Sequence, residues 1–425
     1  MKNKITTLKS LVYDGASLKQ LEINDVVLDR LNYELSIIEK LDLIDYFLNY
    51  SKIVKICNSH DVLRSYGRGS ACGSLVNYCL DITKINPLQE GLIFDRFLNP
   101  ELSINADIDI DISCGHQKMI IEELKAELPK HFIYNLAFLP TSGGETYETV
   151  IINDVSYKKH PCAIIISPDK MPFPIGEYND TEYYYTDNYR NTKFLDNYKF
   201  DILELDYLNK IELIVKLIGD EYHPYKLPLT DKKVFDFFKN GDLSDIFQFN
   251  SDSMRKILHD FQPTSIYDLT IINAVFRPYS INNIPSLIKN KRNGYIDPYK
   301  SDGRVNEILH ETYGTLIYQE TFMYLSNVIA GFSYSEADKY RRILSKGKND
   351  EKISEFRSKF KSGCRENSSL SSEEIDKLDT MILEKAPIAF NKSHSLCYTI
   401  ISYWCAYYKV NFEKEFDSVF SANNK

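Results

Sequence analysis

Residues 104–112 read INADIDIDI, and residues 66–80 read YGRGSACGSLVNYCL. In the first stretch polar and apolar residues alternate, which predicts a strand. Asp107, Asp109 and Asp111 stand at i, i+2 and i+4, so a strand would direct all three to one face and most of the isoleucines toward a core. Carboxylates this close repel one another unless a cation offsets them, and Mg²⁺ prefers such hard oxygen ligands. A solvated polar face of an edge strand explains the pattern equally well.

The second stretch is a glycine-rich turn, Gly67-Arg68-Gly69-Ser70, that leads into an apolar-periodic helix. Glycines let the backbone approach a phosphate closely, and the free N–H groups of the following helix would favour an anion. Ser70 adds a hydroxyl donor and Arg68 a charge suited to phosphate. The G-x-x-x-x-G-K-[ST] pattern of a Walker A loop is absent, and a plain turn is the alternative interpretation.

A third acidic residue, Asp201, lies in KFDI (199–202), at the end of a predicted strand with apolar residues on either side. A third carboxylate beside a D-x-D strand provides the ligands for two divalent ions about 3.5–4 Å apart. Such a pair activates a 3′-hydroxyl and stabilises a leaving pyrophosphate. Together with the glycine-rich turn, these carboxylates indicate the palm of a nucleotidyltransferase.

Length and composition limit the class of protein to which the chain can belong. The chain has 425 residues, 43% of them hydrophobic, which at about 150 residues per domain predicts two or three domains with a real core. We see no apolar run of membrane-spanning length and no signal peptide, so we expect a cytoplasmic protein without a membrane partner. The eight cysteines include no C-x-x-C pair, which argues against a zinc ribbon or a thioredoxin motif.

The net charge of −9 argues weakly against a nucleic-acid binder, but basic residues are concentrated locally. Residues 341–366 carry nine Lys/Arg against four acids. Periodicity predicts a front half of mixed strands and helices and a mostly helical back half, with a boundary near 210–230. We expect a helical region at 25–60, a helix at 117–128, strands at 163–167 and from 198, a loop at 140–156 and a surface segment at 176–195. Helices are predicted at 231–239, 252–261, 265–276, 304–310, 317–330, 334–345, 350–362, 371–385 and 396–410.

The run YGRGSACGSLVNYCLDITKINPLQEGLIFDRFLNPE (66–101), followed by ADIDIDI (106–112), closely resembles the palm of C-family DNA polymerases, the family of the bacterial DNA polymerase III α subunit. Further segments match in colinear order, so the resemblance covers about residues 25–420. HPCA (160–163) stands where the family has H-A-A-G. The other matching segments are YKFDILEL (198–205), GDLSDIFQFNSDSM (241–254), VFRP (275–278), YGTLIYQETFM (313–323), SEADKYRRILSKGK (335–348) and FNKSHSLCY (390–398).

The resemblance implies an α/β (α+β) palm of the polymerase-β-like nucleotidyltransferase type, a reduced thumb and a large, mostly α-helical fingers domain. It assigns residues 1–119 and 157–215 to the palm, 120–156 to the reduced thumb or an insertion, and 216–425 to the fingers. The phosphoesterase (PHP) domain, the clamp-binding module and the OB-fold of the family are expected to be missing. A short thumb predicts low processivity, as in a minimal, phage-encoded polymerase.

By the same resemblance, Asp107, Asp109 and Asp201 are the catalytic ligands of two Mg²⁺ ions, for which Mn²⁺ can substitute. Asp111 matches the family pattern but is assigned no metal. Without the family, Arg341 and Arg342 would be a solvated basic face, His394 structural, and His160 a core hydrogen-bonding residue. The resemblance assigns nucleotide binding to Gly67, Arg68, Gly69, Ser70, Lys199, Arg277, Arg341, Arg342, Lys346, Lys348, Asn391, Lys392, Ser393 and His394.

The function implied is that of a template-directed DNA polymerase, which adds dNMP to a primer 3′-hydroxyl. Its partners would be primer-template DNA, dNTPs and a processivity or replisome protein that replaces the missing thumb and clamp-binding module. It would act in the cytoplasm of a bacterial cell, including a phage-infected one. The alternatives are a template-independent nucleotidyltransferase and a catalytically silent subunit that binds a replisome.

Overall fold

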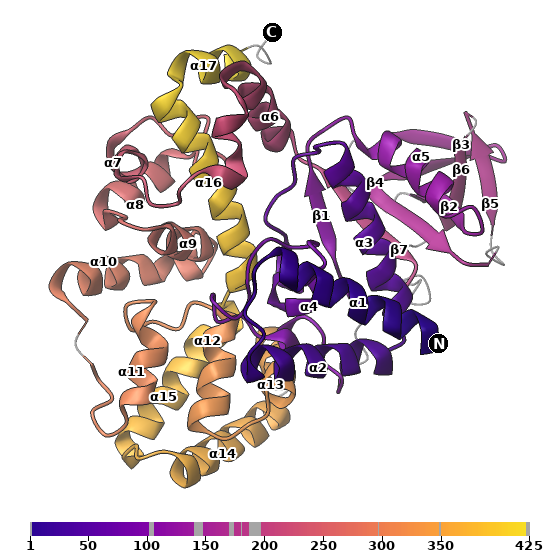
Figure 1. The fold of residues 1–425 in the computed structure, drawn as a ribbon. Helices are drawn as coiled ribbons and strands as arrows, with labels where there is room; N and C mark the ends of the chain where they lie inside the picture. The colour runs from indigo at the N-terminus through magenta and orange to yellow at the C-terminus, as the bar shows by residue number, and fades with distance from the viewer. Residues whose placement is uncertain are drawn as a thin grey trace. The chain divides into compact units, whose positions relative to one another are not determined.

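The chain folds into two compact units (Figure 1). Each unit contains its own cluster of buried hydrophobic residues. Unit 1 comprises Met1–Asn86 and Ile104–Asn209, and unit 2 comprises Pro87–Ser103 and Lys210–Lys425. No helix in the part of the chain described is long and apolar enough to cross a membrane. This computed structural model describes residues 2–101, 106–139, 148–169, 174–179, 181–186, 197–295, 297–347 and 350–421.

Unit 1 is built on a seven-stranded mixed sheet of order β1-β7-β4-β2-β6-β5, with β3 paired to β4. β1 runs parallel to β7, and β7 runs antiparallel to β4. In this register Asp201 lies opposite Asp109 on one side and Ala163 on the other. The strands are β1 (Asp109–Ile112), β2 (Phe132–Phe138), β3 (Thr149–Ile152), β4 (Val155–Ser167), β5 (Ile175–Tyr178), β6 (Thr181–Thr186) and β7 (Lys199–Glu204).

Helix α3 covers one face of β1 and β7 (Figure 1). The ring of Phe200 on β7 lies 5.0 Å from the ring of Tyr46 and 4.8 Å from that of Tyr50, both on α3. Because side chains alternate along a strand, the neighbouring Asp201 projects from the opposite face. The helices of unit 1 are α1 (Lys2–Leu18), α2 (Asp25–Lys40), α3 (Ile44–Ser59), α4 (Leu75–Cys79) and α5 (Gln117–Glu127).

The predicted loop at 140–156 is wrong over its described residues, which include β3 and the start of β4, and the predicted surface segment at 176–195 contains most of β5 and all of β6. Residues 140–147 and 187–196 lie outside the described part of the chain. The β3–β4 connection is a two-residue hairpin in which Asn153 and Asp154 both have positive φ, 51° and 62°. This is the turn that Asn and Asp favour between paired strands. Residues 120–156 therefore contribute most of α5, together with β2 and β3, to unit 1.

Unit 2 is helical, and its central helix is α16 (Lys392–Asn411). Most of the 20 residues of α16 are buried, including Trp404 at 0% exposure. The predicted back-half helices are confirmed with shifts at some ends, except that 317–330 is α12 followed by a π-helical turn at Leu325–Ile329. The remaining helices are α6 (Asp206–Ile218), which leads out of unit 1, α7 (Lys232–Asn240), α8 (Asp252–Phe261), α9 (Ile266–Val275), α10 (Ile284–Asn293), α11 (Gly303–His310), α12 (Gln319–Tyr324), α13 (Tyr334–Lys346), α14 (Asp350–Asn367), α15 (Ser372–Lys385) and α17 (Glu413–Ser421).

Candidate active site

Three carboxylates meet at the β1–β7 pair. Asp107 is exposed and precedes β1, Asp109 begins β1, and Asp201 is the third residue of β7. One oxygen from each lies within 4.8 Å of the others. The parallel register, which sets Asp109 opposite Asp201, accounts for this approach of residues far apart in the sequence. The fold thus brings together the three residues that the sequence singled out as metal ligands.

Two tyrosines of α3 hold the backbone beneath these carboxylates. The Tyr50 hydroxyl accepts the N–H of Asp201 at 3.1 Å and donates to the carbonyl of Ile108, between Asp107 and Asp109. The Tyr46 hydroxyl accepts the N–H of Ile108 at 3.3 Å and donates to the carbonyl of Ala106 at 3.2 Å. Both rings are buried. Tyr50 therefore links the two segments that carry the carboxylates, a role that the sequence reasoning missed.

The uncompensated negative charge of the cluster favours the binding of a cation. Burial, followed by the neighbouring charges of Asp107 and Asp201, raises the pKa of Asp109 from 3.8 to about 7, even though Arg68 acts in the opposite direction. A carboxyl group with so high a pKa is one whose negative charge is poorly compensated. Hard oxygen donors that repel one another at this spacing fit a divalent ion such as Mg²⁺.

Asp111, to which the sequence assigned no metal, anchors the glycine-rich turn to β1. Its carboxylate is 1% exposed. It accepts hydrogen bonds from the hydroxyl of Ser65 at 3.1 Å and from Nη1 of Arg68 at 3.2 Å. Arg68 also lies 3.4 Å from the carboxylate of Asp109. Arg68 is thus held between two acidic side chains, next to the proposed metal ligands.

The turn itself depends on two glycines with positive φ. Gly67 has a φ of 139°, and a Cβ there would come within 2.4 Å of the Cys72 sulfur. Gly69 has a φ of 62° and begins a short 3₁₀ helix, Gly69–Gly73, with Ser70 as its second residue. A side chain at Gly67 would therefore both strain the backbone and clash. Gly67 and Arg68 thus precede the 3₁₀ helix, Gly69 and Ser70 begin it, and none of the four lies in α4.

The expectation that the following helix offers free N–H groups to a phosphate is wrong for α4. The buried carboxylate of Glu34, on α2, accepts the N–H groups of Leu75 and Val76 at 2.9 and 3.0 Å. It also accepts the Ser74 hydroxyl at 2.7 Å and pairs with Arg30 at 2.6 Å. An internal carboxylate thus takes the place that an anion would occupy at this helix start.

Lys199 directly contacts the carboxylate of Asp201 on the same strand. Burial alone would lower the pKa of the Lys199 ammonium, but Asp201 and the other acidic neighbours outweigh it, so that the net shift is upward. Lys199 consequently stays charged and offsets part of the acidic cluster.

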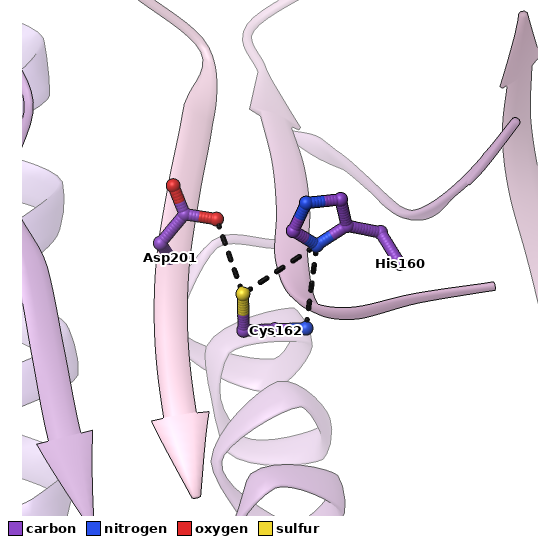
Figure 2. A group of neighbouring side chains, drawn as sticks. All are labelled: His160, Cys162 and Asp201. Atoms are coloured by element: carbon purple, nitrogen blue, oxygen red, sulfur yellow. Dashed lines mark hydrogen bonds between the residues drawn. The ribbon is translucent and has the colours of Figure 1, made fainter. Parts of the chain in front are cut away.

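His160 and Cys162 approach Asp201 from β4, as Figure 2 shows. The Cys162 sulfur lies 3.5 Å from Oδ1 of Asp201 and 3.5 Å from Nδ1 of His160. Burial, and then the charge of Asp201, raises the pKa of the Cys162 thiol, which therefore keeps its proton and donates to the carboxylate. His160 Nδ1 in turn accepts the N–H of Ala163 at 3.0 Å.

In unit 2, Arg277 follows the end of α9 in the segment VFRP. Its guanidinium carbon lies 3.6 Å from the centre of the Phe390 ring. Burial lowers the pKa of Arg277, and among the described residues no carboxylate pairs with it. Its Nε atom is buried without a hydrogen-bond partner in the same part of the chain. Arg277 thus presents a desolvated positive charge, stacked on an aromatic ring, to which an anion would be complementary.

Arg341 and Arg342 of α13 both pair with the fully buried carboxylate of Asp338, at 2.7 Å each. Burial, and then the charge of Arg341, lowers the pKa of the nearby Arg96 to about 10. Three guanidinium groups therefore gather in unit 2, and the sequence reasoning did not include Arg96. Lys346 is exposed in the last turn of α13, and Lys348 lies outside the described residues.

The segment Asn391–His394 forms the start of α16. The Asn391 side chain caps the helix by accepting the N–H of His394 at 3.0 Å, and it donates to Glu320 at 2.7 Å. The buried Lys392 pairs with Glu311 at 2.8 Å, and the Ser393 hydroxyl donates to Asn391 at 2.9 Å. The His394 ring stacks on Tyr398 at 4.4 Å. Asn391, Lys392 and Ser393 are thus engaged within unit 2.

Comparisons with known proteins agree with the sequence resemblance. A family model described as the bacterial DNA polymerase III alpha NTPase domain matches residues 6–141, and one described as the bacterial DNA polymerase III alpha subunit finger domain matches residues 206–368. DNA polymerase III subunit alpha of Staphylococcus epidermidis is 30% identical over 94% of this chain and 43% of its own length. That of Staphylococcus aureus is 29% identical over the same shares.

The chain belongs to the C family of DNA polymerases, that of the bacterial DNA polymerase III α subunit. It spans less than half the length of the curated relatives it matches.

Proposed function

We propose that this chain is a template-directed DNA polymerase that transfers dNMP from a dNTP to a primer 3′-hydroxyl. The observation that carries the proposal is the meeting of Asp107, Asp109 and Asp201, with ligand oxygens within 4.8 Å of one another. Arg68 stands beside this cluster as a phosphate-binding cation. The family membership supports the same reaction, and we assign the sheet of unit 1 to a polymerase-β-like palm.

Asp107 and Asp109 would each hold both ions of a Mg²⁺ pair, for which Mn²⁺ can substitute, and Asp201 would complete the site nearer the primer. When bound, such ions lower the pKa of the attacking hydroxyl and neutralise charge on the transferred phosphoryl group. Tyr46 and Tyr50 fix the backbone of the ligand-bearing segments, so the carboxylates are positioned before substrate arrives. Lys199 compensates the charge of Asp201 and would lie near the primer terminus or the phosphates.

The loop Gly67–Ser70 would hold the triphosphate through Arg68, its backbone N–H groups and the Ser70 hydroxyl. In unit 2, Arg277 is the best candidate for a further phosphate contact, because it carries an unpaired, desolvated charge among the described residues. Arg341, Arg342, Lys346 and Lys348 would bind the triphosphate or the template backbone. Asn391, Lys392, Ser393 and His394 would border the sugar and base.

We also propose low processivity without partners, because the segment 120–156 allotted to the thumb contributes most of its described residues to unit 1. A processivity or replisome protein would provide the contacts to primer-template DNA that a full thumb would otherwise make. A cytoplasmic location in a bacterial cell, including a phage-infected one, fits this role.

The test is primer extension on a defined template, with and without Mg²⁺ or Mn²⁺. We expect template-matched incorporation that needs the metal and is lost in Asp201→Asn, while circular dichroism and thermal unfolding of that variant stay close to wild type. Incorporation that ignores the template would favour a template-independent nucleotidyltransferase. No incorporation by the wild-type chain under any metal condition would favour a silent replisome-binding subunit.

A further inference from the structure

Asp201 belongs to two sets of metal-ligating side chains in unit 1. One is the carboxylate cluster described above. The other consists of Asp201, His160 and Cys162, whose ligand atoms also lie within 4.8 Å of one another (Figure 2). The first set offers only oxygen, whereas the second offers one oxygen, one nitrogen and one sulfur. The two sets therefore suit metals of different chemical hardness.

The spacing of the second set fits tetrahedral coordination. Zn²⁺ binds thiolate sulfur at about 2.3 Å and imidazole nitrogen or carboxylate oxygen at about 2.0–2.1 Å. Two such ligands at a tetrahedral angle stand about 3.5 Å apart. The Cys162 sulfur lies 3.5 Å from Nδ1 of His160 and 3.5 Å from Oδ1 of Asp201. The two distances from the sulfur to the other ligand atoms therefore already match those that a bound ion requires.

The ring nitrogen of His160 that faces the sulfur is in the correct protonation state. Nδ1 accepts the N–H groups of Ala163 at 3.0 Å and of Cys162 at 3.4 Å, so it carries a lone pair and no proton. A metal needs the same lone pair and would have to displace both hydrogen bonds. We therefore expect affinity below that of a structural site with four protein ligands.

We propose that His160, Cys162 and Asp201 form a binding site for a thiophilic divalent cation such as Zn²⁺ or Cd²⁺. On binding, a metal–sulfur bond replaces the S–H bond of Cys162, and the released proton passes to solvent. His160 binds as neutral imidazole and Asp201 as carboxylate. Water would fill the fourth position.

Occupancy of this site has a consequence for catalysis that rests on the proposed polymerase function. A soft ion that takes Oδ1 of Asp201, the oxygen that faces Cys162, leaves the carboxylate cluster only Oδ2, which already contacts Lys199. A soft ion bound to Cys162 would therefore withdraw Asp201 from the carboxylate cluster and inhibit incorporation. Mg²⁺ avoids thiolate ligands, so it would not compete for the sulfur itself.

Binding is measured without any turnover, by titrating the metal-free chain with Cd²⁺ and recording the ultraviolet thiolate-to-cadmium charge-transfer band. We expect a band with one equivalent of Cd²⁺ in wild type. Cys162→Ala should lose this band, and alanine stands at this position in the family segment, so the variant should fold. Cys114→Ala is the matched control, because it removes a more accessible thiol of unit 1 and should leave the band intact.

A third variant separates the histidine from the thiol. His160→Asn keeps an acceptor for the Ala163 N–H but removes the imidazole ligand. It should retain the band with affinity reduced at least about tenfold, by analogy with the loss of supporting groups at metal sites. Absence of the band in wild type, its persistence in Cys162→Ala, or unchanged affinity in His160→Asn would each overturn the proposal.

The inhibition is measured by primer extension at saturating Mg²⁺ with added Zn²⁺. Cys162→Ala should raise the half-inhibiting Zn²⁺ concentration at least about tenfold relative to wild type and Cys114→Ala. Equal Zn²⁺ sensitivity of all three proteins would refute the link to catalysis. If the chain extends no primer, the proposed function fails, but the Cd²⁺ titration still decides whether the site exists.

Discussion

The hydroxyl group of Tyr50 accepts a hydrogen bond from the backbone N–H of Asp201 at 3.1 Å. The same hydroxyl donates to the carbonyl of Ile108, so one side chain sets the spacing of the two segments that carry the carboxylates. Tyr50→Phe removes both bonds and leaves the buried N–H unsatisfied. We predict a loss of about 1–3 kcal/mol in the free energy of unfolding, measured by denaturant titration.

The same variant should also require more Mg²⁺ for half-maximal primer extension, by about tenfold or more, because the ligands are less well positioned. Tyr134→Phe is the control: Tyr134 is a buried tyrosine of β2 whose hydroxyl makes no hydrogen bond to β1 or β7 within the described residues. A Tyr50→Phe protein that is less stable but has wild-type Mg²⁺ dependence would show that the tyrosine has a structural role only.

Asp109 and Asp111 stand two residues apart on β1, but their substitutions should affect different kinetic constants. Asp109→Asn removes a proposed metal ligand and should lower kcat by more than about a hundredfold. Asp111→Asn weakens the anchor of Arg68 and should mainly raise the KM for dNTP, by about tenfold. Steady-state primer extension distinguishes the two. Equal effects on kcat would show that Asp111 belongs to the metal site.

Asp109 should also make the stability of the metal-free chain depend on pH. Its pKa is about 7 in the folded chain and 3.8 ordinarily, so the folded state binds more protons between these values. Its stabilising contribution is therefore complete below pH 3.8 and is lost as pH rises through about 7. The difference in unfolding free energy between wild type and Asp109→Asn, measured across this range, should grow in favour of the variant. A difference that is independent of pH would contradict this.

Glu34 caps α4 from within the core, and its loss should destabilise unit 1. Glu34→Ala removes the ion pair with Arg30 and leaves the N–H groups of Leu75 and Val76 without this acceptor. We predict a loss of about 3–5 kcal/mol in the free energy of unfolding, as for other broken buried pairs. Glu39→Ala, on the exposed face of the same helix, should change it by less than about 0.5 kcal/mol. Similar losses of unfolding free energy in Glu34→Ala and Glu39→Ala would show that Glu34 does not cap α4.

Arg277 should contribute to substrate binding through its charge and its planar shape. Arg277→Lys keeps the charge but loses the flat stacking on Phe390, so we predict a KM for dNTP raised about tenfold. Arg357→Lys is the control in unit 2, because Arg357 is already paired with Asp379. If Arg277→Lys left the KM unchanged, Arg277 would be excluded from nucleotide binding.

The carboxylate-bearing strand and most helices of unit 2 could be predicted because their signals are local. Alternation in INADIDIDI places Ile108, Ile110 and Ile112 in the core, and all three are buried. The pair Asn153-Asp154 also indicates a hairpin turn, because both residue types adopt the positive φ angles that the turn requires. The loop prediction for 140–156 followed the glycine-rich run TSGGET (141–146) and therefore missed β3 (Thr149–Ile152).

Other features could not be predicted because they depend on which element packs where. Tyr46 and Tyr50 have the spacing of core residues on α3, and nothing local shows that a strand places its backbone above their hydroxyls. Glu34 lies in the middle of α2, where a charged residue is expected to face solvent. Only the docking of α4 onto α2 buries it. The contact between Cys162 and Asp201 likewise exists only once β4 and β7 pair.

Arg68 is shared between Asp109 and Asp111, at 3.4 and 3.2 Å. A cation that occupies Asp109 would weaken the hold of that carboxylate on the guanidinium group, which then becomes available to a triphosphate. By thermodynamic linkage, a triphosphate that engages Arg68 would release Asp109 to the cation by the same factor. In the proposed site, one arginine would therefore make metal and nucleotide cooperative ligands, each binding more firmly once the other has bound.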